Sequence, residues 1–323
     1  MRPESAQILN LVQESQRVLM VSHKDADGDT LGTALAMCDV IRAMGKTATL
    51  RCPPPVPEVY SFLPGYEIVN QEEGGPPDLI LVMDASNLDR LSDTLGDLGG
   101  QPVVNIDHHV SNTRFGVVNL VVAEASSTAE VTYNLLLEWG VDISPMAATN
   151  LYCGILTDTG GFLHENTTYE ALSIAAELVR LGADPGDVAM RVYKNKKLSS
   201  IKLSALVMGT IGFDCDDRLV HAYLSQALLE KSGARLEEAD GIIDMLNSVD
   251  GLELALFFKE IEPNKLTKVS IRSRGRANAN LLASKFGGGG HERAAGVEVD
   301  VPLAEAMETI LAEARRMISD PRG

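Results

Sequence analysis

From residue 17 to about 185, short β-branched runs alternate with amphipathic patterns. The runs 17–22, 79–83 and 102–106 are almost wholly apolar, as strands buried on both faces are. Between the first two, apolar residues recur with the i, i+3, i+4, i+7 spacing of a helix, which Gly45 is placed to end: Leu31, Ala34, Leu35, Cys38 and Ile41. A strand-like run at 47–52 follows. Ser127 and Glu130 predict a capping box that opens a helix through Trp139. This alternation predicts an α/β fold with a doubly wound, mostly parallel sheet.

The second part of the chain predicts a smaller α/β domain. The polar, turn-rich stretch 184–197 favours a helical linker. Strand-like runs follow at 219–224, 252–260 and 266–272, and an amphipathic helix at 303–318. We therefore expect a first domain over residues 1–185, a linker over 186–203 and a second domain over 204–323.

Charge and composition limit the partners of the chain. The formal net charge of −17 disfavours long duplex nucleic acid, because phosphate neutralisation dominates such binding. One local basic cluster remains, at Lys265, Lys268, Arg272, Arg274, Arg276, Lys285 and Arg293. No apolar run is long enough to span a membrane, and the N-terminus lacks a signal-peptide pattern. The four scattered cysteines suit buried thiols in a reducing compartment, so we expect a cytoplasmic protein.

Side chains that can bind metals follow the apolar runs. They are Asp107, His108 and His109 after 102–106; His23, Asp27 and Asp29 after 17–22; Asp84 after 79–83; and Asp158 after the apolar run 150–157. Each has an ordinary explanation alone: helix capping, a turn, a helix end or a solvated histidine pair. Four such ends in one α/β pattern favour a shared site at the carboxyl edge of the sheet. Carboxylate and imidazole ligands indicate hard divalent cations rather than thiolate-bound zinc.

A run of four glycines, 287–290, precedes His291 and follows a helical pattern at 280–286. One glycine would suffice as a helix C-cap, and a flexible loop is the simple alternative for four. We interpret the run as a nest of backbone amides that a phosphate or sugar can approach closely. Arg272 and Arg274, just upstream, supply guanidinium groups that match phosphate geometry.

The order and spacing of these motifs resemble those of the DHH phosphoesterase superfamily. His-x-x-x-Asp-x-Asp at 23–29, Asp84, Asp107-His-His and Asp158-Thr-Gly look like its four motifs. The Arg-Ser and Gly-Gly-Gly-Gly-His elements look like the DHH-associated C-terminal nucleic-acid-binding domain. Residues 111–112 and 125–128 also look like the compact bacterial members that act as oligoribonucleases (nanoRNases) and 3′-phosphoadenosine 5′-phosphate (pAp) phosphatases. Thr33 stands where many members have serine, which keeps the hydroxyl.

The resemblance implies a metal-dependent phosphoesterase with two Mn²⁺ ions, or Mg²⁺ or Co²⁺ in their place. One ion would be held by His23, Asp27, Asp84 and Asp158, and the other by Asp29, Asp84, His108 and Asp158. Asp84 and His109 would be catalytic, with His109 beside the scissile phosphate. The nucleotide would be bound by Asn112, Arg272, Arg274, Gly288, Gly289, Gly290 and His291. Two such cations activate a water that attacks phosphorus in line.

The resemblance implies short RNA, pAp and the dinucleotide pApA as substrates, hydrolysed to mononucleotides such as AMP. A manganese pyrophosphatase or exopolyphosphatase shares the first domain but does not need the Gly-rich element. A long-strand exonuclease of the RecJ type needs more basic surface and further domains. A nucleotide-sensing module without activity would not need an intact ligand set. We also expect a homodimer, the commonest oligomer.

Overall fold

The computed structural model describes residues 1–71, 75–91, 100–195, 197–239 and 241–319. The chain divides into two compact units, residues 1–195 and 196–323. Each unit has its own sheet and its own core. None of the helices in these ranges is long and apolar enough to cross a membrane.

The first unit is built on a five-stranded parallel sheet with the order β2-β1-β3-β4-β5. Its strands are β1 (Arg17–Val21), β2 (Thr47–Arg51), β3 (Leu79–Met83), β4 (Val103–Asp107) and β5 (Val118–Val121). The strands predicted from the sequence are confirmed, as is the α/β class. The strand order changes direction at β1, because β2 lies on one side of it and β3 on the other. Ligands bind at such a point in open α/β sheets.

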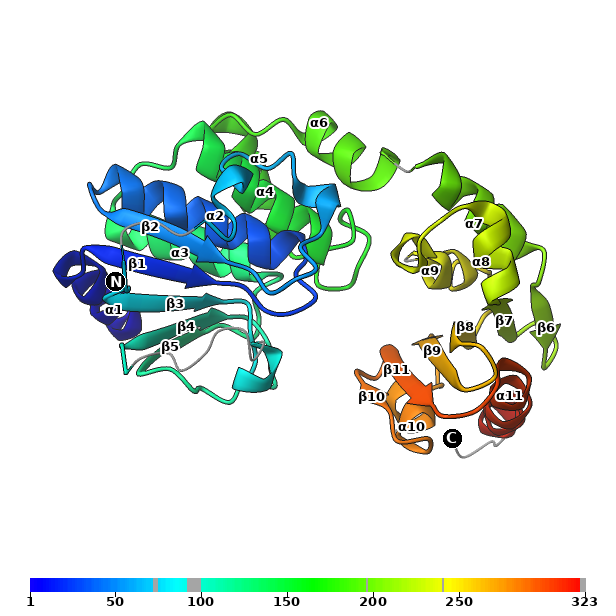
Figure 1. The fold of residues 1–323 in the computed structure, drawn as a ribbon. Coiled ribbons are helices and arrows are strands. Elements are labelled where there is room, and N and C mark those ends of the chain that lie inside the picture. Colours follow the sequence, from blue (N-terminus) through cyan, green and yellow to red (C-terminus); the bar gives the residue numbers. More distant parts are fainter. Residues whose placement is uncertain (72–74, 92–99, 196, 240, 320–323) are drawn as a thin grey trace. The chain divides into compact units, whose positions relative to one another are not determined.

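Most helices of the first unit lie on one face of this sheet, where α2, α3 and α4 pack together (Figure 1). The helices are α1 (Pro3–Glu14), α2 (Gly28–Ala43), α3 (Thr128–Trp139), α4 (Pro145–Asp158), α5 (Tyr169–Arg180) and α6 (Pro185–Ala189), with the short turns η1 (Glu58–Tyr60), η2 (Tyr66–Ile68), η3 (Leu88–Arg90) and η5 (Met190–Lys194). Alternate strand residues such as Leu19 and Val82 face the other side and form a smaller core with Ala85 and Leu91. Both faces are therefore apolar, which explains the uninterrupted apolar runs.

Two predicted helix ends are confirmed in detail. Gly45, with φ +80°, follows α2, and its amide donates to the Arg42 carbonyl at 2.9 Å. Ser127 Oγ caps α3 by accepting from the Glu130 amide at 3.1 Å. The Glu130 carboxylate reaches back to the Ser126 amide at 3.0 Å, one residue earlier than in the usual capping box.

The apolar run 150–157, which we grouped with the runs that end at the carboxyl edge of the sheet, is helical. The whole stretch Pro145–Asp158 is helix α4, capped by Ser144 Oγ, which accepts from the Ala147 amide at 3.1 Å. Its residues are apolar around most of the circumference because α2, α3 and α5 surround it. A helix enclosed in this way loses the periodicity that would distinguish it from a buried strand. Asp158 is thus the last residue of a helix rather than the residue after a strand.

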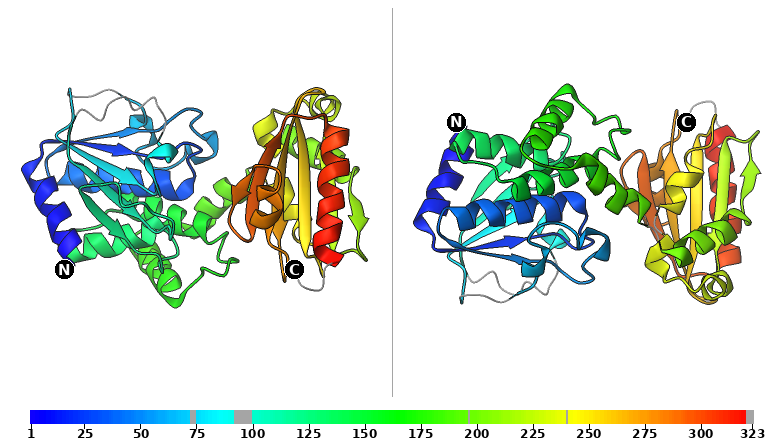
Figure 2. Two further views of the ribbon diagram at one scale, coloured as in Figure 1. Left: turned by 90° about the horizontal axis from the view of Figure 1, so that it is seen from below. Right: turned by 90° about the horizontal axis from the view of Figure 1, so that it is seen from above.

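The second unit contains a six-stranded mixed sheet with the order β10-β11-β9-β8-β7-β6. Its strands are β6 (Gly212–Asp214), β7 (Leu219–Leu224), β8 (Leu254–Glu262), β9 (Leu266–Ser273), β10 (Gly289–Gly290) and β11 (Ala294–Val299). Only β7 and β8 pair in parallel. The helices are α7 (Leu198–Met208), α8 (Gln226–Ser232), η6 (Leu236–Ala239), α9 (Ile242–Leu246), α10 (Ala279–Ser284) and α11 (Leu303–Ser319). α11 runs along one face of the sheet, and α7 and α9 cover the other (Figure 2).

Candidate metal centre

The turn from β1 into α2 carries three of the predicted ligands. Asp27 is the N-cap of α2, and its Oδ1 accepts from the amides of Asp29 and Thr30, each at 3.0 Å. A carboxyl oxygen of Asp27 also lies within 4.8 Å of ligand atoms of His23 and Asp84. The capping and the metal-binding interpretations are therefore compatible, because the carboxylate has two oxygens.

Asp84 lies at the centre of the cluster. It follows β3 with a left-handed φ of +60° and is only 2% exposed. Its amide donates to the Ile106 carbonyl at 2.9 Å, and its Oδ1 accepts from Thr128 Oγ1 at 2.8 Å. Such a φ is unfavourable for a non-glycine residue and is typical of functional sites. These bonds fix the carboxylate between the ends of three elements.

Two imidazoles turn their Nε2 atoms toward the carboxylates. His23 Nδ1 lies 2.6 Å from the Lys24 carbonyl, and His108 Nδ1 lies 3.2 Å from the Ala125 carbonyl. A carbonyl accepts from an N–H, so the neutral form of each ring carries its proton on Nδ1 and turns the Nε2 lone pair toward the carboxylates. The His23 Nε2 is 3.4 Å from Asp84 Oδ2. The His108 Nε2 is 3.7 Å from Asp84 Oδ1 and 3.5 Å from Asp158 Oδ2.

A close crossing of α2 and α4 brings Asp29 to the same centre as Asp158. A Cβ on Gly154 would lie 2.8 Å from Asp29 Oδ1, and one on Gly32 would lie 2.3 Å from the Asn150 carbonyl oxygen. Asp29 is 1% exposed, and its two oxygens accept from the Thr128 and Ala129 amides at the start of α3. Asp29, His108 and Asp158 form a second group of ligand atoms within 4.8 Å of one another.

His109 and Asp107 form a separate hydrogen-bonded pair beside the cluster. His109 Nδ1 lies 2.7 Å from Asp107 Oδ1, and Asp107 Oδ2 accepts from Asn112 Nδ2 at 2.6 Å. Asp107 is fully buried and is in none of the groups of potential ligands found among the described residues. It orients His109 and leaves the ring's Nε2 free. Asn112, predicted to bind substrate, here positions Asp107.

The buried carboxylates carry negative charge that the protein does not fully compensate. Burial, with the charges of Asp29 and Asp27, raises the pKa of Asp84 well above its usual range. Burial likewise raises the pKa of Asp29, and it raises that of Asp158 to about 7. Burial alone would lower the pKa of His108, but the charges of Asp29, Asp158 and Asp84 outweigh it and raise this pKa. The hydrogen bond to Asp107 raises the pKa of His109 to about 9. Such a site favours cations.

Several residues of this centre escaped the sequence interpretation. Gly28 leaves room for a neighbouring side chain, since a Cβ there would lie 2.6 Å from the Thr157 side chain. Gly154 allows Asp29 to approach α4, and Thr128 supports both Asp84 and Asp29. The only available signal was the small size of the residues at 28, 32 and 154. Small residues on two facing helices permit a close crossing.

In the second unit, the four glycines form structure that differs from the predicted nest. Gly287, with φ +82°, follows α10, and the Gly288 amide donates to the Ala283 carbonyl at 3.0 Å. Gly289 and Gly290 pair with β11 as the edge strand β10. A Cβ on Gly288 or on Gly290 would meet backbone at 2.5 Å or less, whereas one on Gly289 would meet open space apart from Asn280 Oδ1 at 3.9 Å. Sterically, three of the four positions require glycine.

Most of the positive charges in the basic cluster are paired with acidic side chains in the folded protein. Arg272 Nε bonds to Asp244 Oδ1 at 3.1 Å, and four other members are also paired with acids: Lys265 with Glu262, Lys268 with Glu298, Lys285 with Glu313, and Arg293 with Glu292. Arg274 and Arg276 have no ion-pair partner among the described residues. His291 is exposed, and its amide donates to the Ala294 carbonyl at 2.7 Å.

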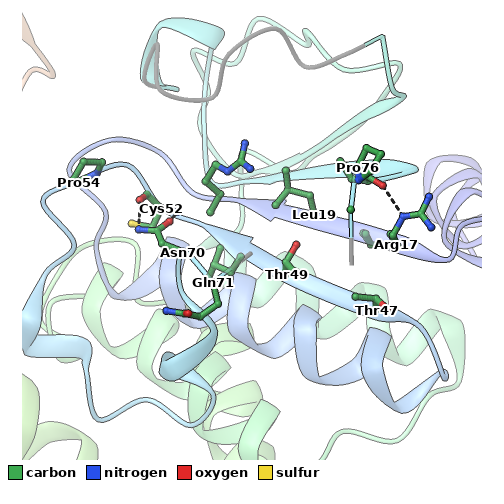
Figure 3. A pocket seen from close by; sticks show the side chains of 14 residues that line it. Arg17, Leu19, Thr47, Thr49, Cys52, Pro54, Asn70, Gln71 and Pro76 are labelled. Atoms are coloured by element: carbon green, nitrogen blue, oxygen red, sulfur yellow. Dashed lines mark hydrogen bonds between the residues drawn. The ribbon is translucent and has the colours of Figure 1, made fainter. Parts of the chain in front are cut away.

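A pocket of about 700 Å³ lies elsewhere on the first unit, against β1 and β2 (Figure 3). Its lining includes Arg17, Thr47, Thr49 and Gln71, and Arg17 Nε donates to the Pro76 carbonyl at 2.6 Å. No residue predicted for the site is among the described residues that line it. Its size alone therefore does not make it the reactive site.

Comparison with known proteins agrees with this arrangement. Residues 17–155 match the DHH family N-terminal domain, and residues 216–320 match the DHHA1 domain. The chain is 34% identical over 321 residues to a protein of Thermus thermophilus named bifunctional oligoribonuclease and PAP phosphatase NrnA, covering 97% of this chain and 93% of that protein. The Bacillus subtilis protein of the same name is 27% identical, covering 91% and 92%.

Among solved structures, an exopolyphosphatase-related protein from Bacteroides fragilis superposes with a TM-score of 0.90 at 25% identity. The alignment covers 98% of both chains. The family resemblance inferred from the motifs is thus confirmed over both units. The chain belongs to the DHH family, with a DHH N-terminal domain followed by a DHHA1 domain.

Proposed function

We propose that this protein is a metal-dependent phosphoesterase that hydrolyses short oligoribonucleotides, including pApA, and pAp to mononucleotides such as AMP. The observation that carries the proposal is the position of Asp84, whose carboxyl group lies close to His23 and Asp27 on one side and to His108 Nε2 on the other. The names of the Thermus thermophilus and Bacillus subtilis relatives support the choice of substrates.

The donor set suits two hard cations. His23, Asp27, Asp84 and Asp158 would hold one, and Asp29, Asp84, His108 and Asp158 the other. The orientation of both histidines supports this, because their Nε2 atoms point at carboxylates whose protonation is favoured in the absence of metal. Sites in which carboxylates predominate suit Mn²⁺, which we propose here, with Mg²⁺ or Co²⁺ as alternatives. When bound, two such cations supply an activated water and neutralise charge on the phosphate.

We propose that the His109 side chain contacts the reacting phosphate. Its Nδ1–H is held by Asp107, so its Nε2 is the atom that faces substrate. In the protein without metal, the hydrogen bond to Asp107 raises the pKa of His109 to about 9. A ring protonated on Nε2 can donate that proton to an oxygen of the scissile phosphate or to the leaving oxygen. Asn112 keeps Asp107 in place and thereby acts as a positioning residue.

The DHHA1 domain would bind the nucleotide end. Arg274 is exposed and has no acidic partner in the described parts of the chain, so its guanidinium is available to a phosphate. Arg272 would exchange Asp244 for substrate. Gly288, Gly289, Gly290 and His291 edge the same sheet as β9, which carries Arg272. The open space beside Gly289 makes it the glycine at which backbone can be approached.

A second candidate function is hydrolysis of pyrophosphate or polyphosphate, which the name of the Bacteroides fragilis structure favours. A nucleotide-sensing module without activity is the third. One assay separates all of them: Mn²⁺-loaded protein is incubated with pAp, RNA of two to five nucleotides, a 24-nucleotide RNA, pyrophosphate and polyphosphate. We expect the fastest release of mononucleotide from pAp or the short RNAs. Faster phosphate release from pyrophosphate or polyphosphate would reverse the ranking, and no product from any substrate would favour the sensing module.

A further inference from the structure

The face of the first sheet that is turned away from α2, α3 and α4 changes character at β2. On β1 and β3 this face is apolar and belongs to the smaller core, to which Leu19 contributes. Thr49 is paired in register with Leu19, so the two side chains point to the same side of the sheet. Because side chains alternate along a strand, Thr47 and Arg51 share this side with Thr49. The outward face is therefore polar along the edge strand.

Polar residues are ordinary on an edge strand, but here they lie in the pocket of about 700 Å³ against β1 and β2 (Figure 3). Asn70 anchors one end of this pocket to β2, because its side chain accepts from the Cys52 amide at 2.8 Å and donates to the Cys52 carbonyl at 2.9 Å. Arg17 anchors the other end by donating to the Pro76 carbonyl at 2.6 Å and to Asp78 Oδ1 at 2.8 Å. These bonds hold the described parts of the wall in place, so the pocket is preformed.

The pocket offers hydrogen-bonding groups that the protein itself does not use. Arg51 is exposed and has no ion-pair partner in the described parts of the chain. The hydroxyls of Thr47 and Thr49 and the side-chain amide of Gln71 likewise have no hydrogen-bond partner among the described residues. None of the described residues that line the pocket is acidic, although the whole chain has a net charge of −17. Such a lining favours an anionic ligand that carries further polar groups.

The two arginines of the pocket can make different contacts with a ligand. Arg17 is paired in register with Thr47, and Arg51 lies four residues further along β2, which separates their backbones by about 13 Å along the strands. Two donors in the plane of the Arg17 guanidinium are occupied by Pro76 and Asp78. The Arg17 side chain is nevertheless 39% exposed, so its flat face can stack on an aromatic ring. Arg51 retains its N–H donors, whose planar arrangement matches a phosphate group.

We propose that this pocket binds a nucleoside monophosphate, at a site separate from the metal centre. The phosphate binds to the guanidinium of Arg51, and the base stacks on the guanidinium face of Arg17. The ribose hydroxyls lie between them, where Thr47 and Thr49 supply partners, and Leu19 adds apolar surface beside the base. The volume agrees with this ligand, because sites for small molecules have volumes of about 300–1,000 Å³.

Calorimetric titration of the full chain with AMP, in the presence of chelator, tests the site. Arg51→Ala should weaken binding at least about tenfold with unchanged circular dichroism, because it removes charge-assisted hydrogen bonds to the phosphate. Thr49→Val keeps the shape of the side chain and should weaken binding by a smaller factor. Arg180→Ala is the matched control, since Arg180 is an exposed arginine of the same unit outside the pocket, and its affinity should equal that of the wild type. No binding to the wild type, or equal affinity in Arg51→Ala, would overturn the proposal.

Fragments of the ligand test its chemical class in the same titration. Ribose 5-phosphate lacks the base that stacks on Arg17 and should bind about fivefold more weakly than AMP, and adenosine, which lacks the phosphate, should bind more weakly still. Ribose 5-phosphate that binds as tightly as AMP would assign the pocket to sugar phosphates and overturn the nucleotide assignment. AMP binding that is lost in Arg274→Ala but retained in Arg51→Ala would place the nucleotide on the second unit instead. The titrations need neither metal nor turnover, so the proposed hydrolysis can fail without affecting their result.

Discussion

Replacing Asp158 by asparagine should stabilise the metal-free protein at pH 8 and remove most of the stabilisation that Mn²⁺ provides. Burial raises the pKa of Asp158 from 3.8 to about 7, so the folded state binds a proton more tightly than the unfolded state. Stability from this group is complete below pH 3.8 and is lost as the pH rises through about 7. At pH 8 the metal-free protein therefore contains an unfavourable buried charge, which asparagine lacks.

The shift of about three units corresponds to about 4 kcal/mol at 1.36 kcal/mol per unit. The side chain is 28% exposed and its charge interacts with His108, so we take about half of this, about 2 kcal/mol. For a unit of this size that corresponds to an increase in Tm of roughly 4–8 °C. With Mn²⁺ bound, the wild type should have the higher Tm of the two proteins, because it retains the Asp158 carboxylate that would bind the ion.

Thermal unfolding at pH 8, with chelator and with saturating Mn²⁺, measures both effects. Asp187→Asn is the control, since Asp187 is an exposed acid that pairs with the exposed Arg191, and the Tm of this variant should change little in either condition. The reasoning would be refuted by an Asp158→Asn protein that is less stable than the wild type without metal, or that gains as much Tm from Mn²⁺ as the wild type gains.

Four further outcomes follow from the same account. Asp84→Asn should abolish Mn²⁺ binding measured by calorimetry and hydrolysis of pAp, with circular dichroism unchanged; turnover like that of the wild type would contradict the ligand assignment. Arg272→Ala and His291→Ala should slow pAp hydrolysis at least tenfold while calorimetry shows normal Mn²⁺ binding; normal kinetics in both would remove them from the substrate site. Gly154→Ala should lower the free energy of unfolding by about 1–3 kcal/mol and weaken Mn²⁺ binding, because its Cβ would press on Asp29 Oδ1. Cleavage rates should fall from a trinucleotide to a 24-nucleotide RNA at low salt, because the net charge of −17 repels the longer strand, and the gap should narrow as salt screens that repulsion; equal rates at low salt would count against the preference for short substrates.

Much of the fold could be predicted because, in many elements, the local sequence pattern matches the surroundings of the element in the folded protein. The runs that became β1, β3 and β4 are short, β-branched and bounded by turns, and they end in the residues that meet at the sheet edge. The helix end at Gly45 and the cap at Ser127 follow from backbone requirements that act over one turn. Such features depend on residues that are close together in the sequence, so they can be predicted from the sequence alone.

The predictions differ from the structure where the conformation depends on residues that are distant in sequence but close in space. Residues 150–157 form a helix because α2, α3 and α5 enclose them, and an enclosed helix shows no polar face. The glycines 287–290 form a C-cap and an edge strand because Val297 and Ala295 pass close by, which no local pattern reveals. Asp107 was grouped with its two histidines, but burial directs its carboxylate to His109 and Asn112. The candidate metal ligands could be grouped from the sequence, because acids and histidines that follow parallel strands converge at one edge of the sheet.

Low-temperature electron paramagnetic resonance of Mn²⁺ added to the wild-type protein tests the central claim most directly, because it distinguishes paired ions from isolated ones. Asp84 lies close to His23 and Asp27 and also to His108, so the account predicts two ions per chain close enough for their spins to couple. The first two equivalents should give a coupled signal instead of the six-line spectrum of isolated Mn²⁺, and Asp84→Asn should show only the six-line spectrum of free ions. A six-line spectrum from the wild type at two bound equivalents would contradict the shared centre.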